Sequence, residues 1–220
     1  MAAKKRHQTN YWISYSDLMA GLLFVLLAIV VVATIQYERK IGENIDLRKN
    51  IAKELLERLK DYDHVDVDPD TGNIEFKEID NFWFIKNSDV LLKPARTLLD
   101  QVMPIYFAVL FDERFAKNKL DRIMIEGHAS FERDERYLSD LDLSQRRAYS
   151  VGRYVMMNSD DACSDKLRKY MVTLGRSFAD AKHKGENEMM RSKDRRVVVR
   201  FTLQYEKMMR DLIGVEDNEG

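Results

Sequence analysis

The sequence predicts an α+β protein with a single N-terminal transmembrane helix, a helical stalk and a C-terminal globular domain. Three observations predict this organisation. The first is an uncharged apolar run of about 18 residues near the N-terminus, close to the length needed to cross a bilayer. The second is a segment of dense mixed charge that follows it, with apolar residues at helical spacing. The third is the alternation of strand-like and helix-like patterns in the rest of the chain, which is typical of an α+β domain.

The composition excludes several classes of protein. The 220 residues carry a formal net charge of -1, which argues against direct nucleic-acid binding through bulk positive charge. The 9 glycines and 3 prolines are too few for a collagenous or low-complexity chain. The single cysteine, Cys163, excludes an intrachain disulfide and a cysteine-based zinc site, and the 4 histidines are scattered. We therefore expect no metal and no cofactor.

The membrane helix is predicted over residues 12–37, after an N-terminal tail at 1–11. Its apolar run extends from Leu18 to Ile35, and Trp12 and Tyr37 stand where interfacial aromatic residues are expected. A cleaved signal peptide would have a shorter apolar core that ends in small residues. Here isoleucines and valines lead directly into charged residues, which favours a retained helix.

Asp17 stands at the start of this span and has two interpretations. It is a helix N-cap at the interface, since aspartate suits that position, or an ion-carrying carboxylate inside the membrane. The second interpretation needs a helix that begins upstream of Asp17. Helical spacing then places it on one face with Ser14, Ala20, Gly21, Phe24 and Ala28, and the small residues of that face permit close helix approach or a narrow polar passage. The pattern alone leaves both interpretations open.

Residues 38–61 are predicted to form the helical stalk, and residues 62–205 the globular domain. Alternating residues on either side of a turn at 69–73 predict a β-hairpin over 64–76. A helix is expected over 93–111, with a kink or break at Pro104. The remaining expected elements are a strand at 123–126, a helix at 143–157, a strand at 173–175, a surface loop at 181–193, a strand at 196–203 and a C-terminal helix or tail at 206–220.

No constellation in the sequence predicts catalysis. His128 and Ser130 lie two residues apart at the end of a predicted strand, but no third group has the context that a nucleophilic site requires. A hydrogen-bonded turn explains this pair. We therefore expect a protein without a catalytic site of its own.

Three segments of the predicted domain resemble the OmpA-like peptidoglycan-binding family. They are Ile123-Met124-Ile125-Glu126-Gly127-His128-Ala129-Ser130, Asp140-Leu141-Asp142-Leu143-Ser144-Gln145-Arg146-Arg147-Ala148 and Asp194-Arg195-Arg196-Val197. Their order and spacing make the resemblance specific, although each alone is a weak signal. The resemblance implies a βαβαββ-type domain that grips the diaminopimelate of the cell-wall stem peptide.

The resemblance also implies which residues bind the wall. Arg147 matches the binding arginine, whose guanidinium suits bidentate capture of a carboxylate. The neighbouring pattern positions are Asp140, where the family has asparagine, and Leu143, and the third segment contributes Arg196. Ser130 stands where the family has its ligand-binding aspartate. Two nearby acids are candidates to replace that carboxylate: Glu132 and Asp134.

The segment from Tyr15 to Val25 resembles the B subunits of flagellar stators and, more closely, those of Zorya anti-phage defence systems. This resemblance implies an ion-driven rotary motor, powered by protons or sodium, with Asp17 as its ion carrier. It also implies two copies of this chain within a pentamer of a multi-span A subunit in the bacterial inner membrane. The N-terminus would be cytoplasmic and the domain periplasmic. A flagellar stator subunit and a passive wall anchor are the alternatives.

Overall fold

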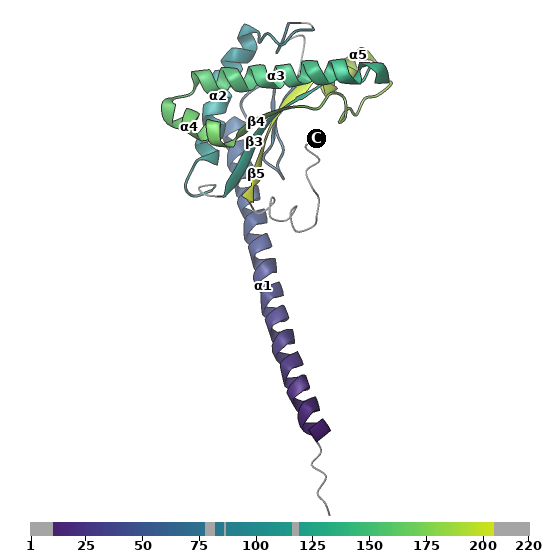
Figure 1. Cartoon of the computed structure of the whole chain (residues 1–220). Coiled ribbons are helices and arrows are strands. Elements are labelled where there is room, and N and C mark those ends of the chain that lie inside the picture. The colour runs from purple at the N-terminus through teal and green to yellow at the C-terminus, as the bar shows by residue number, and fades with distance from the viewer. Residues whose placement is uncertain (1–10, 78–81, 86, 116–118, 205–220) are drawn as a thin grey trace, which may run out of the picture. The chain divides into compact units, whose positions relative to one another are not determined.

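A computed structural model describes residues 11–77, 82–85, 87–115 and 119–204, with side chains from residue 15 onward (Figure 1). The chain divides into two compact units, Met1–Ile45 and Asp46–Gly220. The predicted N-terminal tail, apart from its last residue, and the predicted C-terminal helix or tail at 206–220 lie outside the described residues.

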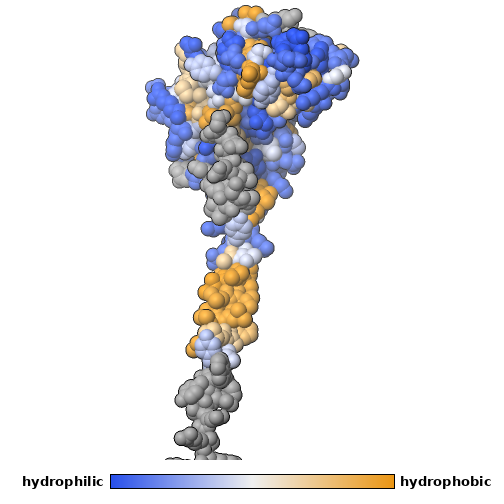
Figure 2. Space-filling model, turned by 45° about the vertical axis from the view of Figure 1, so that its right-hand side comes forward, coloured by the Kyte–Doolittle hydropathy of each residue, from blue (hydrophilic) through white to orange (hydrophobic). Residues whose placement is uncertain are grey.

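The N-terminal helix α1 (Tyr11–Leu59) is continuous over 49 residues, so the predicted membrane helix and stalk form one element. Within the described residues it is the one helix long and apolar enough to cross a membrane. Its apolar residues from Leu18 to Ile35 are exposed, and Figure 2 shows an orange band on the visible face of this part of the helix. An exposed apolar surface of this kind is typical of a helix whose solvent is lipid.

The last turns of α1 belong to the second unit. Their apolar side chains are buried in its core: Leu47, Ile51, Ala52, Leu55 and Leu59. Arg48 lies on the same turns and donates hydrogen bonds to the carbonyl oxygens of Thr71 at 2.9 Å and Phe201 at 3.0 Å. The compact unit therefore begins at Asp46, earlier than residue 62, where the sequence patterns placed the start of the domain.

A five-stranded sheet organises the second unit, in the order β1-β2-β5-β3-β4. The predicted hairpin is confirmed as an antiparallel β1–β2 pair, and β3 and β4 are parallel while β5 runs antiparallel to both β2 and β3. The crossover that joins the parallel strands β3 and β4 is helical, as is usual for a parallel pair. The strands are β1 (Val65–Val67), β2 (Ile74–Lys77), β3 (Leu120–His128), β4 (Met171–Gly175) and β5 (Arg196–Leu203).

Helices α2 (Lys93–Leu110) and α3 (Tyr137–Asn158) supply much of the hydrophobic core, together with alternate residues of the strands. Figure 1 shows α3 running across the sheet. In β3, for example, Ile123 and Ile125 are buried whereas Met124 between them is half-buried. Helix α2 continues across Pro104 without a break, and Pro104 lies on its exposed side. The α+β class predicted from the sequence is confirmed.

Four short elements were not predicted. Helix α4 (Asp161–Tyr170) follows α3 and is capped by the side chain of Asp160. Helix α5 (Glu188–Arg191) lies inside the segment that was expected to be a loop, and a 3-10 turn, η2 (Ser192–Asp194), continues it. A similar turn, η1 (Asp134–Arg136), precedes α3, which begins earlier than its apolar pattern indicated.

Candidate functional site

The first turns of α3 approach the sheet closely because two glycines leave room for them. A Cβ atom at Gly127, in β3, would collide with the carbonyl oxygen of Ser144 in α3. A Cβ atom at Gly175, at the end of β4, would lie 2.6 Å from the backbone nitrogen of Gln145. Only glycine permits such an approach of backbone to backbone. Residues 140–147 of α3 are therefore held against the ends of β3 and β4.

Hydrogen bonds secure the loop that follows β4 to the same end of the domain. The backbone nitrogen of Ser177 donates to the Ser144 hydroxyl at 3.1 Å, and the Ser177 hydroxyl donates to the Tyr137 carbonyl at 2.9 Å. The backbone nitrogen of Ala129, just after β3, donates to the Ser177 carbonyl at 2.7 Å. These contacts link the end of β3, the start of α3 and the loop after β4.

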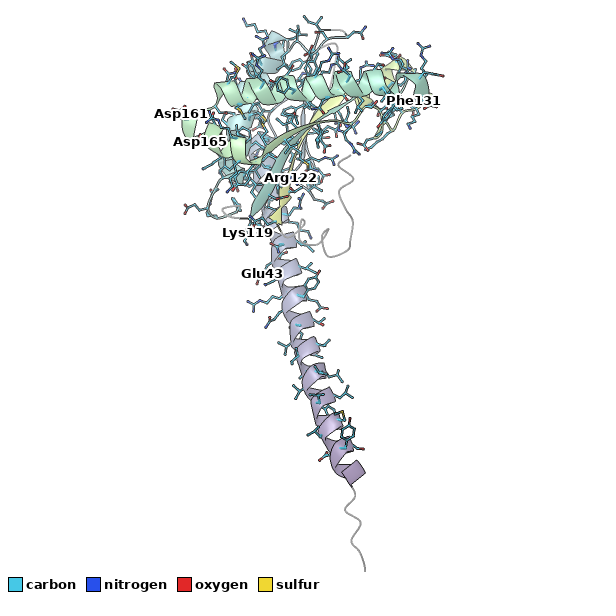
Figure 3. All side chains as sticks on the ribbon, in the orientation of Figure 1. Glu43, Lys119, Arg122, Phe131, Asp161 and Asp165 are labelled. Carbon is cyan, nitrogen blue, oxygen red and sulfur yellow. The ribbon has the colours of Figure 1, made fainter. Side chains whose placement is uncertain are left out.

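A cavity of about 670 Å³ lies at this end of the domain. In Figure 3, Phe131 is labelled near the start of α3, at this end of the domain, and Asp161 and Asp165 lie beyond the opposite end of α3. Four of the five residues that the sequence assigned to wall binding line the cavity: Ser130, Asp140, Leu143 and Arg147. The other lining residues are Phe84, Asn87, Ala129, Glu132, Arg136, Glu188, Met189, Ser192 and Arg195.

Arg147 is positioned by the segment that precedes α2. Its Nε donates to the Ser88 carbonyl at 3.0 Å, and its guanidinium lies 4.8 Å from the centroid of the Phe84 ring. A hydrogen bond together with a cation–π contact fixes both the position and the plane of a guanidinium. Arg147 is thereby held as part of the cavity wall.

Asp140 is buried in the cavity wall and is paired with Arg136, whose Nη2 lies 3.3 Å from its carboxylate. The Nη1 of Arg136 contacts Glu132 at 2.8 Å, so one guanidinium serves two acids. Burial raises the pKa of Asp140 above its ordinary value, against the opposing effect of Arg136. Of the two acids considered as replacements for the family's aspartate, Glu132 lines the cavity and Asp134 does not.

Arg195 lines the cavity, whereas its neighbour Arg196 does not. The Nη1 of Arg195 lies 2.7 Å from Glu188 and 3.3 Å from the Ser130 hydroxyl. Arg196 is the first residue of β5 and contacts Glu75 on β2 at 3.4 Å. Sequence reasoning selected one arginine of an adjacent pair. The signal that separates them is strand register, because consecutive residues at a strand end point to opposite faces.

Asp194 organises the segment that brings Arg195 to the cavity. Its carboxylate accepts hydrogen bonds from the backbone nitrogens of Lys182 and His183, each at 3.0 Å, and contacts His183 Nδ1 at 3.0 Å. Burial raises the pKa of this carboxyl, but these hydrogen bonds outweigh that effect and leave the pKa below its ordinary value. Asp194 therefore acts as an ionised anchor for residues 182–195.

Asp17 lies in the first unit, on α1 and exposed, directly before the apolar run. The same helix face carries Ala20 and Gly21, and an added Cβ at Gly21 would meet nothing within 4 Å. Small residues of this kind allow a neighbouring helix to approach closely. Among the described residues, no group of three or more histidine, cysteine, aspartate or glutamate side chains is arranged to hold a metal ion.

No family model matches the chain. A curated relative, the Zorya protein ZorB of Escherichia coli, is 30% identical over 171 residues, which cover 69% of this chain and 70% of that protein. Among solved structures, a putative MotB-like protein from Desulfovibrio vulgaris aligns with a TM-score of 0.50 and 17% identity, covering 73% of this chain and 93% of that one. The cell wall anchor of the type VI secretion system from Pseudomonas aeruginosa aligns with a TM-score of 0.48 and 19% identity, covering 71% of this chain and 98% of that one.

The fold is thus that of a MotB-like α+β domain, preceded by a helix with the length and composition of a membrane span. The identity and coverage of the curated relative go further than the fold. The chain belongs to the family of the Zorya protein ZorB.

Proposed function

We propose that this chain is the peptidoglycan-anchored B subunit of an ion-driven rotary membrane motor that serves anti-phage defence. The observation that carries the proposal is its membership of the ZorB family, together with a carboxylate directly before the apolar run of α1. The charged cavity in the second unit supports the anchoring part of the proposal.

Asp17 is the proposed ion carrier. A carboxylate inside a membrane costs about 2.5–3.5 kcal/mol on insertion scales, so such residues are typically functional. Binding of a proton or a sodium ion neutralises the charge and removes most of this cost. Passage of one charge down the membrane potential supplies about 2.3 kcal/mol per 100 mV. Since one apolar helix cannot enclose an ion path, the proposal requires membrane partners. The resemblance to stator B subunits implies that these are a second copy of the chain and a pentameric multi-span A subunit.

The cavity is the proposed attachment to peptidoglycan. Arg147, oriented by Phe84 and Ser88, is suited to bind a carboxylate of the wall, and Ser130, Asp140 and Leu143 line the same space. Attachment to the wall would hold the dimer still while the A subunits rotate around it. This assignment requires the second unit to lie in the periplasm and the N-terminus in the cytoplasm. The side chain of Arg196 is buried and contacts Glu75, so Arg196 would stabilise the sheet and would not contact the wall.

The central experiment replaces Asp17 by asparagine, which keeps the size of the side chain and removes its charge. We expect Asp17→Asn to abolish ion flux and phage protection, while the variant still co-purifies from membranes with a multi-span partner. The matched control is Asp46→Asn, since Asp46 is exposed on the same helix but outside the apolar run. It should retain full protection. Undiminished protection by Asp17→Asn would contradict the motor proposal.

Two measurements separate this proposal from its alternatives. Co-purification followed by mass measurement should give two copies of this chain with five of a polytopic partner; recovery of the chain alone would indicate a passive anchor. A deletion strain should lose phage protection and keep its motility. Loss of motility instead would indicate a flagellar stator subunit.

A further inference from the structure

The Ser130 end of the cavity presents hydrogen-bond donors. Ser130 is 7% exposed, and its hydroxyl oxygen accepts a hydrogen bond from Arg195 Nη1 at 3.3 Å. Both contacts that Arg195 makes, to Ser130 and Glu188, use Nη1. Within the described part of the chain, Nη2 and Nε of Arg195 have no partner, and neither does the hydroxyl proton of Ser130. Three kinds of donor therefore remain for a ligand at this end.

The acid nearest to Arg195 is already used. Glu188 accepts from Arg195 through Oε1 at 2.7 Å and from Arg191 through Oε2 at 2.9 Å. These contacts lower the pKa of Glu188, chiefly through the hydrogen bond from Arg195, so it is ionised and paired at neutral pH. An ammonium group placed beside Ser130 would meet a guanidinium and would have to compete with two arginines for this one carboxylate.

We propose that Ser130 and Arg195 form a carboxylate subsite and make the cavity selective for a free carboxylate, not an ammonium, at this end of the wall stem peptide. The inference rests on the proposed wall binding and deepens it. The donors suit a carboxylate because a guanidinium can pair with both of its oxygens while the hydroxyl donates to one. Arg147 lines the same cavity, so the preferred ligand carries two carboxylates.

A structural role for Arg195 would give a different result. If its only task were to hold α5 through Glu188, its replacement would weaken every ligand to the same extent. If Arg195 binds a carboxylate directly, its replacement weakens most the ligands that place a carboxylate beside it. A pair of small probes makes the distinction: pimelate, which has two carboxylates, and meso-diaminopimelate, which has the same carbon chain with two added ammonium groups.

The test is sedimentation of the full-length, detergent-purified protein with purified sacculi, in competition with each probe. We expect pimelate to release the protein at a lower concentration than meso-diaminopimelate. Ser130→Asp restores a carboxylate, which attracts an ammonium group and repels a carboxylate, and it should reverse this order, with about a tenfold change in the ratio of the two concentrations. Arg195→Gln should raise the pimelate concentration needed about tenfold and affect meso-diaminopimelate less. Arg168→Gln is the control, because Arg168 lies on α4, outside the cavity, and is 70% exposed.

The outcomes distinguish this inference from the proposed function. If the wild-type protein does not sediment with sacculi, the wall-binding proposal is wrong, and the carboxylate subsite with it. If it sediments and meso-diaminopimelate competes as well as pimelate or better, only the carboxylate subsite is wrong. If Arg195→Gln weakens competition by both probes to the same extent, the carboxylate subsite is also wrong. If Ser130→Asp does not fold, the result with Arg195→Gln is by itself sufficient to test the carboxylate subsite.

Discussion

The guanidinium of Arg147 lies over the ring of Phe84, 4.8 Å from its centroid. Phe84 is 2% exposed and bridges to Leu91 just before α2, so its ring is fixed by the core. The arginine extends from α3, more than fifty residues later in the chain. A segment that the three family-like motifs do not include therefore sets the orientation of the residue on which the proposed wall binding depends.

This relationship predicts that Phe84→Leu weakens binding to sacculi while the domain remains folded. Leucine keeps the site apolar and removes the cation–π contact, which is worth about 0.5–1 kcal/mol at such sites. Sedimentation with sacculi should therefore show an affinity reduced about two- to fivefold. The control is Phe111→Leu, which removes a similar contact with Lys166, at 4.9 Å, away from the cavity. Equal losses in both variants would contradict a local role for Phe84.

A second prediction concerns the approach of α3 to the sheet. Gly175→Ala should destabilise the domain by about 1–3 kcal/mol, because the added methyl group meets the backbone of α3 at Leu141 and Gln145. It should also weaken wall binding, since α3 carries Leu143 and Arg147. Gly42→Ala is the control: Gly42 is helical with open space around it, so alanine should be neutral or stabilise the helix by up to about 1 kcal/mol. Denaturant unfolding of the detergent-solubilised protein provides the measurement.

A third prediction concerns the last turns of α1. Arg48→Met should lower the free energy of unfolding by about 1.5–3 kcal/mol, since it removes the hydrogen bonds from a charged group to the Thr71 and Phe201 carbonyls. Methionine retains much of the apolar stem of the arginine. The matched control is Arg39→Met, which removes an exposed ion pair with Glu43 on the same helix and should cost less than about 0.5 kcal/mol. Equal effects of the two variants would show that the hydrogen bonds of Arg48 do not stabilise the domain.

Local patterns predicted much of the fold. The alternation of residues at 64–76 was sufficient to predict the hairpin, and the β-branched run at 196–203 was sufficient to predict β5. The start of the compact unit was missed because the apolar residues of α1 between Leu47 and Leu59 keep one helical period throughout. That period does not reveal whether they face water or a sheet. Helix α4 was missed because it is short and strongly polar, with Leu167 as its one buried residue.

The candidate site was predicted in part for a related reason. The family-like motifs indicated residues on β3, α3 and β5, and four of these lie together in the cavity. Motifs do not include the segments that complete the site by tertiary packing, so Phe84 and Glu188 were missed. Arg195 was missed because choosing between two adjacent arginines requires the register of the strand that follows them. Replacement of the family's aspartate by Ser130 was visible in the sequence, but its contact with Arg195 was not.

The last prediction concerns pH and the anchor of residues 182–195. The pKa of Asp194 is lower in the folded protein than its ordinary value of 3.8, so the folded state binds a proton less readily than the unfolded state. Its stabilising contribution is therefore complete above about pH 4 and is lost as the pH falls further, towards the depressed pKa. Asp194→Asn should reduce the free energy of unfolding by about 2–3 kcal/mol at pH 7. The two oxygens of the carboxylate accept from the backbone nitrogens of Lys182 and His183, one each, whereas an amide has only one oxygen. The difference between wild type and variant should shrink as the pH is lowered from 5 to 3. A difference that is constant across this range would mean that Asp194 does not anchor the segment as an ionised group, and a difference that grows would reverse the sign of the proposed linkage.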